Sequence, residues 1–106
     1  MEVLKIRTRR TYYKDYGIDE EDVNIIKERC RNMDDDERYL LWNAAMYANP
    51  SIAKELYTSL EQQKTYRQMA DIDYIPYNYE DFYGYQRLCL VIFRNLLIFS
   101  GKYKCA

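Results

Sequence analysis

The chain has 106 residues, of which 48% are hydrophobic and 31% charged, with only three glycines and two prolines. This length and composition predict a single all-α domain, a compact bundle of four or five helices, and argue against disorder or a strand-rich fold. Histidine is absent and the three cysteines lack metal-ligand spacing, so we expect neither a metal site nor another cofactor.

The distribution of apolar residues predicts a cytoplasmic protein. No apolar run reaches the roughly 18–20 residues of a membrane span, and the N-terminal residues lack the apolar stretch of a signal peptide. An odd number of widely spaced cysteines is typical of reduced thiols. A membrane partner is therefore not expected.

Residues 1–17 are predicted to form a basic N-terminal arm in front of one helical domain, residues 18–106. Residues 1–14 contain five basic side chains against the single acid Glu2, so the remainder of the chain is acidic. Such an arm is either a solvated extension or a segment that binds DNA phosphates or an acidic protein surface. The side chains that would carry the binding role are Arg7, Arg9, Arg10 and Lys14.

The first helix is predicted to begin after Asp19, which can cap it, with acids at 20–22 near its positive end. Ile18 and Val23 have the spacing of a hydrophobic staple. The inward face has helical spacing and comprises Val23, Ile26, Cys30 and Met33.

Two further helices follow closely in the sequence. Asp34 and Glu37 have the spacing of a capping box, and the expected apolar face is Leu40, Leu41, Ala44, Tyr47 and Ala48. Asn49 can cap the next helix with Pro50 in its first turn, and its expected inward residues are Ile52, Ala53, Leu56, Tyr57 and Leu60.

A short helix is expected at 65–70, followed by an irregular connection, because Pro76 disfavours helical backbone at Ile75. The last and longest helix is predicted to begin after the cap Asn78 and to end at Gly101. We expect its inward stripe to be Phe82, Tyr85, Cys89, Ile92, Leu96 and Phe99, and its outward set to be Tyr79, Glu80, Tyr83 and Arg87.

The apolar surface of this last helix is wider than one stripe. Such a helix is either central to the domain or covered by a partner chain. A homodimer through residues 88–99 is therefore one prediction.

No catalytic signature is present in the sequence. The acidic runs occupy first-turn positions, where carboxylates stabilise helices, and neither a Gly-rich phosphate loop nor a GxSxG motif occurs. Cys30 and Cys89 lie on apolar helix faces, which indicates inert thiols. We therefore expect a protein without enzymatic activity.

The segment "SLEQQKTYRQMADIDYIPYNYEDFYGYQRLCLVIFRNLL" resembles the C-terminal part of small prophage-encoded regulators of the ArpU type, which are similar to sigma-factor region 4. The resemblance covers roughly residues 55–97. It implies a helix-turn-helix-like C-terminal half and sequence-specific DNA binding in phage transcription, with the last helix in the major groove. The residues that would contact duplex DNA are Tyr77, Asn78, Tyr79, Tyr83 and Arg87.

The residues themselves leave a second function open. Tyrosine-rich surfaces are typical of protein interfaces, and Glu80 and Asp81 lie where DNA-binding helices favour neutral or basic side chains. The alternative is a small inhibitor of anti-defence type. It would cover a nucleic-acid site on a host enzyme through an acidic, tyrosine-rich surface.

Overall fold

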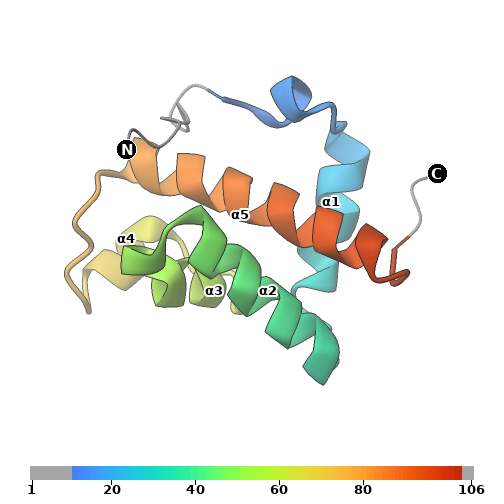
Figure 1. The fold of residues 1–106 in the computed structure, drawn as a ribbon. Coiled ribbons are helices and arrows are strands. Elements are labelled where there is room, and N and C mark those ends of the chain that lie inside the picture. The colour runs from blue at the N-terminus through green and yellow to red at the C-terminus, as the bar shows by residue number, and fades with distance from the viewer. Residues whose placement is uncertain (1–10, 104–106) are drawn as a thin grey trace, which may run out of the picture.

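The computed structural model describes residues 11–103, and every regular element within that range is helical. The elements are η2 (Tyr13–Tyr16), α1 (Glu20–Arg29), α2 (Asp35–Ala48), η3 (Pro50–Ile52), α3 (Ala53–Glu61), α4 (Tyr66–Ala70) and α5 (Tyr79–Phe99). The predicted all-α bundle of four or five helices is confirmed (Figure 1). None of the helices in the described part of the chain has the length and apolarity needed to cross a membrane.

The helix starts follow the capping residues predicted from the sequence. The Asp19 carboxylate accepts from the Asp22 backbone N–H at 2.8 Å, and the Asn78 amide oxygen accepts from the Asp81 N–H at 2.9 Å. Asp34 and Glu37 form the expected capping box. At the far end Gly101 adopts φ 77°, a left-handed conformation that glycine tolerates and that ends α5.

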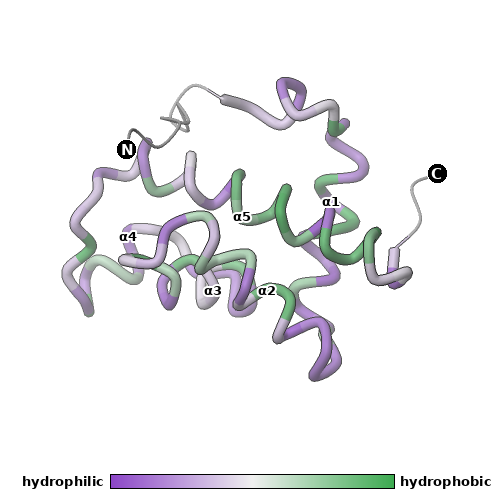
Figure 2. The backbone as a smooth tube through the Cα atoms, viewed as in Figure 1, coloured by the Kyte–Doolittle hydropathy of each residue, from purple (hydrophilic) through white to green (hydrophobic). Residues whose placement is uncertain are grey.

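Helix α5 is the centre of the fold and contacts each of the other four α-helices as well as η2. Figure 1 shows α2 to α4 on one side of α5 and η2 on the other, while α1 crosses α5 near its C-terminal half. The hydrophobic residues of α5 extend along most of its length (Figure 2). The residues that are buried on it include Phe82, Leu88, Cys89, Leu90, Val91, Phe93 and Leu97.

The apolar face that motivated the predicted homodimer is thus largely covered within the chain. Two inward predictions are wrong. Phe99 is 90% exposed and Tyr47 is 75% exposed. At 100° per residue, Phe99 lies roughly opposite the buried Leu97 on α5, and Tyr47 lies roughly 120° from the buried Leu41 on α2.

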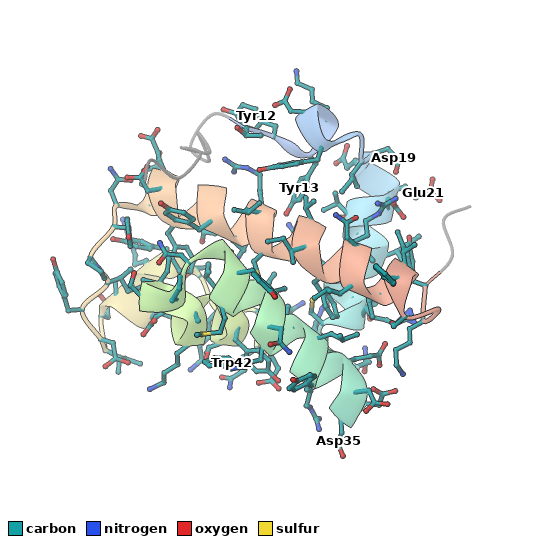
Figure 3. The ribbon with its side chains drawn as sticks, viewed as in Figure 1. Tyr12, Tyr13, Asp19, Glu21, Asp35 and Trp42 are labelled. Carbon is teal, nitrogen blue, oxygen red and sulfur yellow. The ribbon has the colours of Figure 1, made fainter. Side chains whose placement is uncertain are left out.

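The described part of the predicted arm packs on α5 rather than extending away from the domain. Arg87 Nε donates to the Thr11 carbonyl at 2.9 Å, and its guanidinium lies 4.9 Å from the centre of the Tyr12 ring. Tyr13 points from η2 toward α5 (Figure 3), and burial raises the pKa of its hydroxyl. Thr11 and Tyr12 therefore lie in contact with Arg87 of α5.

A polar cluster at the opposite end of α5 ties three parts of the chain together. Arg94 Nε donates to the Asp22 carboxylate at 2.8 Å, and both side chains are 16% exposed. The Tyr103 hydroxyl also donates to Asp22. Hydrogen bonding from Tyr103, followed by the contact with Arg94, lowers the pKa of the Asp22 carboxyl. This cluster fixes α1 and the C-terminal segment to α5.

We predict that Asp22→Asn lowers the free energy of unfolding at pH 7 by about 1.5–3 kcal/mol, the usual contribution of a hydrogen bond to a charged group. A lowered folded-state pKa stabilises the protein above the ordinary aspartate pKa of about 3.9, and this stabilisation is lost as pH falls through the folded value. Urea unfolding of both proteins should therefore show a difference that shrinks below about pH 4.

Asp35→Asn is the matched control, since the Asp35 side chain is 98% exposed and, among residues 11–103, pairs only with Arg38 on the same helix. It should change stability by less than about 1 kcal/mol. Equal effects of the two substitutions at pH 7 would contradict the structural role of Asp22.

Candidate partner-binding surface

The connection between α4 and α5, residues 71–78, carries large apolar side chains that face solvent. Tyr74 is 87% exposed and Ile72 75% exposed, and Tyr79 on the first turn of α5 is 60% exposed. Single exposed apolar residues are ordinary, whereas several on one short segment are typical of an interaction site. We call Ile72, Tyr74 and Tyr79, with the acids Asp71, Asp73 and Glu80, the acidic aromatic surface.

The acids of this surface are available for binding. Asp71, Asp73 and Glu80 form no ion pair with any residue in the described range. The contrast is clear at α2, whose exposed stripe consists of Tyr39, Trp42, Met46 and Tyr47. There the neighbouring carboxylates of Asp35 and Glu61 both lie within ion-pair distance of Arg38.

The connection is fastened at both of its ends. After α4, the Asp73 N–H donates to the Met69 carbonyl at 2.9 Å. Before α5, the Tyr66 hydroxyl donates to the Tyr77 carbonyl at 2.6 Å, and Ile75 between them is buried. The exposed side chains of Ile72 and Tyr74 are therefore presented by a backbone that is held in place.

The Tyr77 side chain packs against the domain and holds the connection in place. Its ring lies 5.3 Å from that of Tyr85, and its hydroxyl is 3.5 Å from the Ser51 hydroxyl on η3. Hydrogen bonding with Asn49 and then Ser51 lowers the pKa of the Tyr77 hydroxyl. The half-buried ring thus serves the fold.

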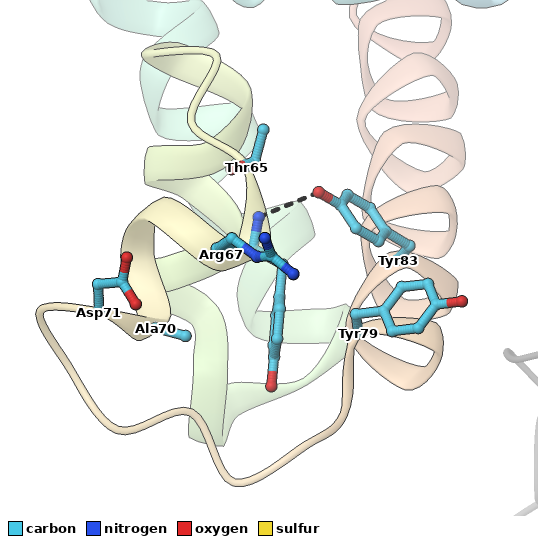
Figure 4. Close-up of a pocket in the computed structure, with 7 residues that line it drawn as sticks. Thr65, Arg67, Ala70, Asp71, Tyr79 and Tyr83 are labelled. Carbon is cyan, nitrogen blue, oxygen red and sulfur yellow. Dashed lines mark hydrogen bonds between the residues drawn. The ribbon is translucent and has the colours of Figure 1, made fainter.

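A pocket of about 400 Å³ adjoins the acidic aromatic surface between α4 and α5 (Figure 4). Tyr83 reaches from α5 toward α4, and its hydroxyl accepts from the Tyr66 backbone N–H at 3.0 Å. Since a dry cavity of about 150 Å³ already admits benzene, this pocket has room for an aromatic side chain. We call it the tyrosine pocket, and its lining residues are Thr65, Tyr66, Arg67, Ala70, Asp71, Tyr79 and Tyr83.

The structure brings only some of the predicted site residues together. Tyr79 and Tyr83 both line the tyrosine pocket, and Asn78 lies next to it as the cap of α5. Arg87 is held against Thr11, and Lys14 is exposed on η2. The predicted residues Arg7, Arg9 and Arg10 lie outside the described part of the chain.

Several residues of the surface were not predicted from the sequence. The sequence places Asp71, Ile72 and Tyr74 only in an irregular connection, and Arg67 only in a short helix. An isoleucine and a tyrosine in an acidic, non-helical segment are a signal of exposed apolar area, because such a segment has no periodic inward face.

The structure also describes the two cysteines that could have supplied a nucleophile. Both Cys30 and Cys89 are fully buried and free. Burial raises the pKa of the Cys30 thiol to about 12 and raises that of Cys89 as well. These thiols are therefore not activated. Within residues 11–103 no cluster of acids and cysteines is arranged to hold a metal ion.

Comparison of the chain with protein-family models, with curated proteins and with solved structures finds no match. The resemblance to ArpU-type regulators consequently stays a prediction, and function is argued from the surface of this chain alone.

The burial of the thiols predicts slow chemical modification. In a Cys105→Ser variant, Cys30 and Cys89 should not react with a disulfide reagent at pH 8 while the protein is folded, because thiolates form too rarely and are covered. Both should react once the protein is unfolded in guanidinium chloride. A thiol that reacts quickly in the folded protein would contradict the described burial.

The hydrogen bond between Tyr83 and α4 predicts a measurable cost for Tyr83→Phe. The Tyr66 N–H would lose its acceptor, which should lower stability by about 1–2 kcal/mol and speed amide exchange at Tyr66. Tyr79→Phe, on an exposed ring of the same pocket, is the control and should change neither quantity. Unchanged exchange in Tyr83→Phe would show that this contact does not hold α4.

Proposed function

We propose that the protein is a non-catalytic binding module that attaches to a basic surface of another protein through its acidic aromatic surface. A nucleic-acid site on an enzyme is a surface of this kind. The observation that carries the proposal is the combination of three exposed apolar side chains, Ile72, Tyr74 and Tyr79, with three carboxylates that lack ion-pair partners in the described structure.

The two kinds of side chain support binding in different ways. Tyrosines supply large contact area with few rotatable bonds, and their hydroxyl groups keep the free surface hydrated. Carboxylates at the rim of an interface raise the association rate with a basic partner and disfavour acidic ones. The tyrosine pocket adds a recess beside Tyr79 that can receive an anchoring side chain, the arrangement in which interface hot spots are found.

The described geometry gives less support to DNA binding through α5. A recognition helix presents several side chains on one exposed face to the base edges of the major groove. Between residues 82 and 97 of α5, Asn95 alone has an exposed side chain, and the others are buried or half-buried. The first turn offers the acids Glu80 and Asp81 near the place where phosphates would lie. DNA binding by this helix therefore stays a prediction from sequence.

The test begins with cross-linked capture of partners from a nuclease-treated lysate, followed by affinity measurements with the purified partner. We expect Tyr74→Ser and Tyr79→Ser each to weaken binding by about 1–2 kcal/mol or more, as for central aromatic contacts. Asp73→Asn should slow association, and most strongly at low salt. Addition of the protein should displace nucleic acid from the partner.

Tyr47→Ser is the matched control, because Tyr47 is as exposed as Ile72 but lies on α2. It should leave the affinity unchanged. Loss of binding in Tyr47→Ser together with normal binding in Tyr74→Ser would move the interface to α2 and contradict the proposal. Binding that disappears after nuclease treatment would contradict it as well.

A further inference from the structure

A second pocket, of about 210 Å³, collects positive charge in a chain whose helical body is acidic. Its lining includes three cations, Lys27 on α1, Arg31 just beyond α1, and Lys64 between α3 and α4. None of the described residues that line it is acidic. We call it the cationic pocket.

The cations of this pocket are only partly neutralised by the protein. Arg31 lies 2.8 Å from the Glu28 carboxylate, whereas Lys27 and Lys64 form no ion pair with a described residue. Lys27 and Arg31 are both positively charged and line the same pocket, so they repel each other. An anion between these groups would remove that repulsion.

Gln63 at the edge of the pocket has a backbone conformation that is unusual for its residue type. Its φ is 55°, in the left-handed region that costs a non-glycine residue free energy and is enriched at ligand sites. When the Gln63 amide is oriented so that its oxygen faces Arg31, this oxygen accepts hydrogen bonds from the Arg31 guanidinium. Gln63 thereby orients Arg31 at the edge of the pocket.

The inner wall of the pocket is polar and rigid. Gln86 Nε2 donates to the Ser59 hydroxyl at 3.0 Å, and that hydroxyl donates to the Leu56 carbonyl at 2.7 Å. Both Gln86 and Ser59 are buried. Such a wall is suited to a polar ligand and does not favour an apolar one.

The size of the pocket restricts the ligand. Its volume of about 210 Å³ is enough for one phosphate group. A duplex backbone needs cations spread along a groove. Three cations around one small recess instead fit a single terminal phosphate group, which carries a charge of about −1.5 to −2 at pH 7.

We propose that the cationic pocket binds the terminal phosphate of a phosphate monoester, with Lys27, Arg31 and Lys64 as its charged ligands. Tyr83 lines both this pocket and the tyrosine pocket. The organic part of the ester can therefore extend past Tyr83 toward the tyrosine rings. This site is independent of the proposed protein-binding function, since none of its three cations belongs to the acidic aromatic surface.

The test is calorimetric titration of the full chain with ribose 5-phosphate at low ionic strength. We expect binding to the unaltered protein, and a loss of at least about tenfold in affinity for each of Lys27→Gln and Lys64→Gln, because each removes a charge-assisted contact. Lys54→Gln, which removes an exposed lysine of α3, is the control and should leave affinity unchanged. Thermal unfolding of every variant checks that the fold persists.

Adenosine 5′-monophosphate distinguishes the sources of the phosphate. Tighter binding of this nucleotide than of ribose 5-phosphate would support the site and place a base near the tyrosine rings, and equal binding would support a site for the phosphate alone. Absence of ribose 5-phosphate binding would overturn the proposal. So would equal losses in Lys54→Gln and Lys64→Gln, or tighter binding of a blunt duplex that lacks terminal phosphates.

Discussion

The fold is determined by one constraint. The apolar surface of α5 extends around most of the helix and must be buried by other elements. Helix α5 has buried residues at consecutive positions from 88 to 91, and consecutive helical residues point in directions 100° apart. One neighbouring helix cannot cover such a surface. The chain therefore places α2 to α4 against one side of α5 and η2 against the other, and α1 crosses it.

Covering α5 in this way also determines which surfaces remain for function. A buried central helix has few exposed side chains that could contact a ligand or a DNA groove. The surfaces available for binding therefore lie around the ends of this helix. At the first turn of α5, the connection from α4 exposes the acidic aromatic surface beside the tyrosine pocket. The cationic pocket is formed by residues at the ends of α1 and α3, and it shares Tyr83 with the tyrosine pocket. The two sites differ in charge, and Tyr83 stands near both.

Much of the fold could be predicted from the sequence because its determinants are local. Caps such as Asp19 and Asn78 act over three residues, and helical periodicity reports an inward face directly. The side-chain environment was harder to predict where it depends on tertiary contacts. Arg87 looks like an outward cation on α5, yet its partner Thr11 is 76 residues away in sequence.

The candidate sites were predicted less well than the helices for the same reason. Tyr79 and Tyr83 were predicted because both belong to the outward set of one predicted helix, which the resemblance places on DNA. Lys27 and Lys64 come from different elements, and only the packing of α1 against α5, and of α3 against α5, brings them to one pocket. The sequence carries no local pattern that links them. The exposure of Tyr47 likewise follows from the choice of which α2 face meets α5.

Amide hydrogen exchange along α5, in the free protein and with duplex DNA at low salt, tests the central claim most directly. If α5 is the covered core of the domain, its amides between residues 86 and 97 should exchange only through global unfolding. Duplex DNA should give α5 no added protection of its own. Rapid exchange in this stretch, or protection that appears on α5 with DNA, would contradict the account.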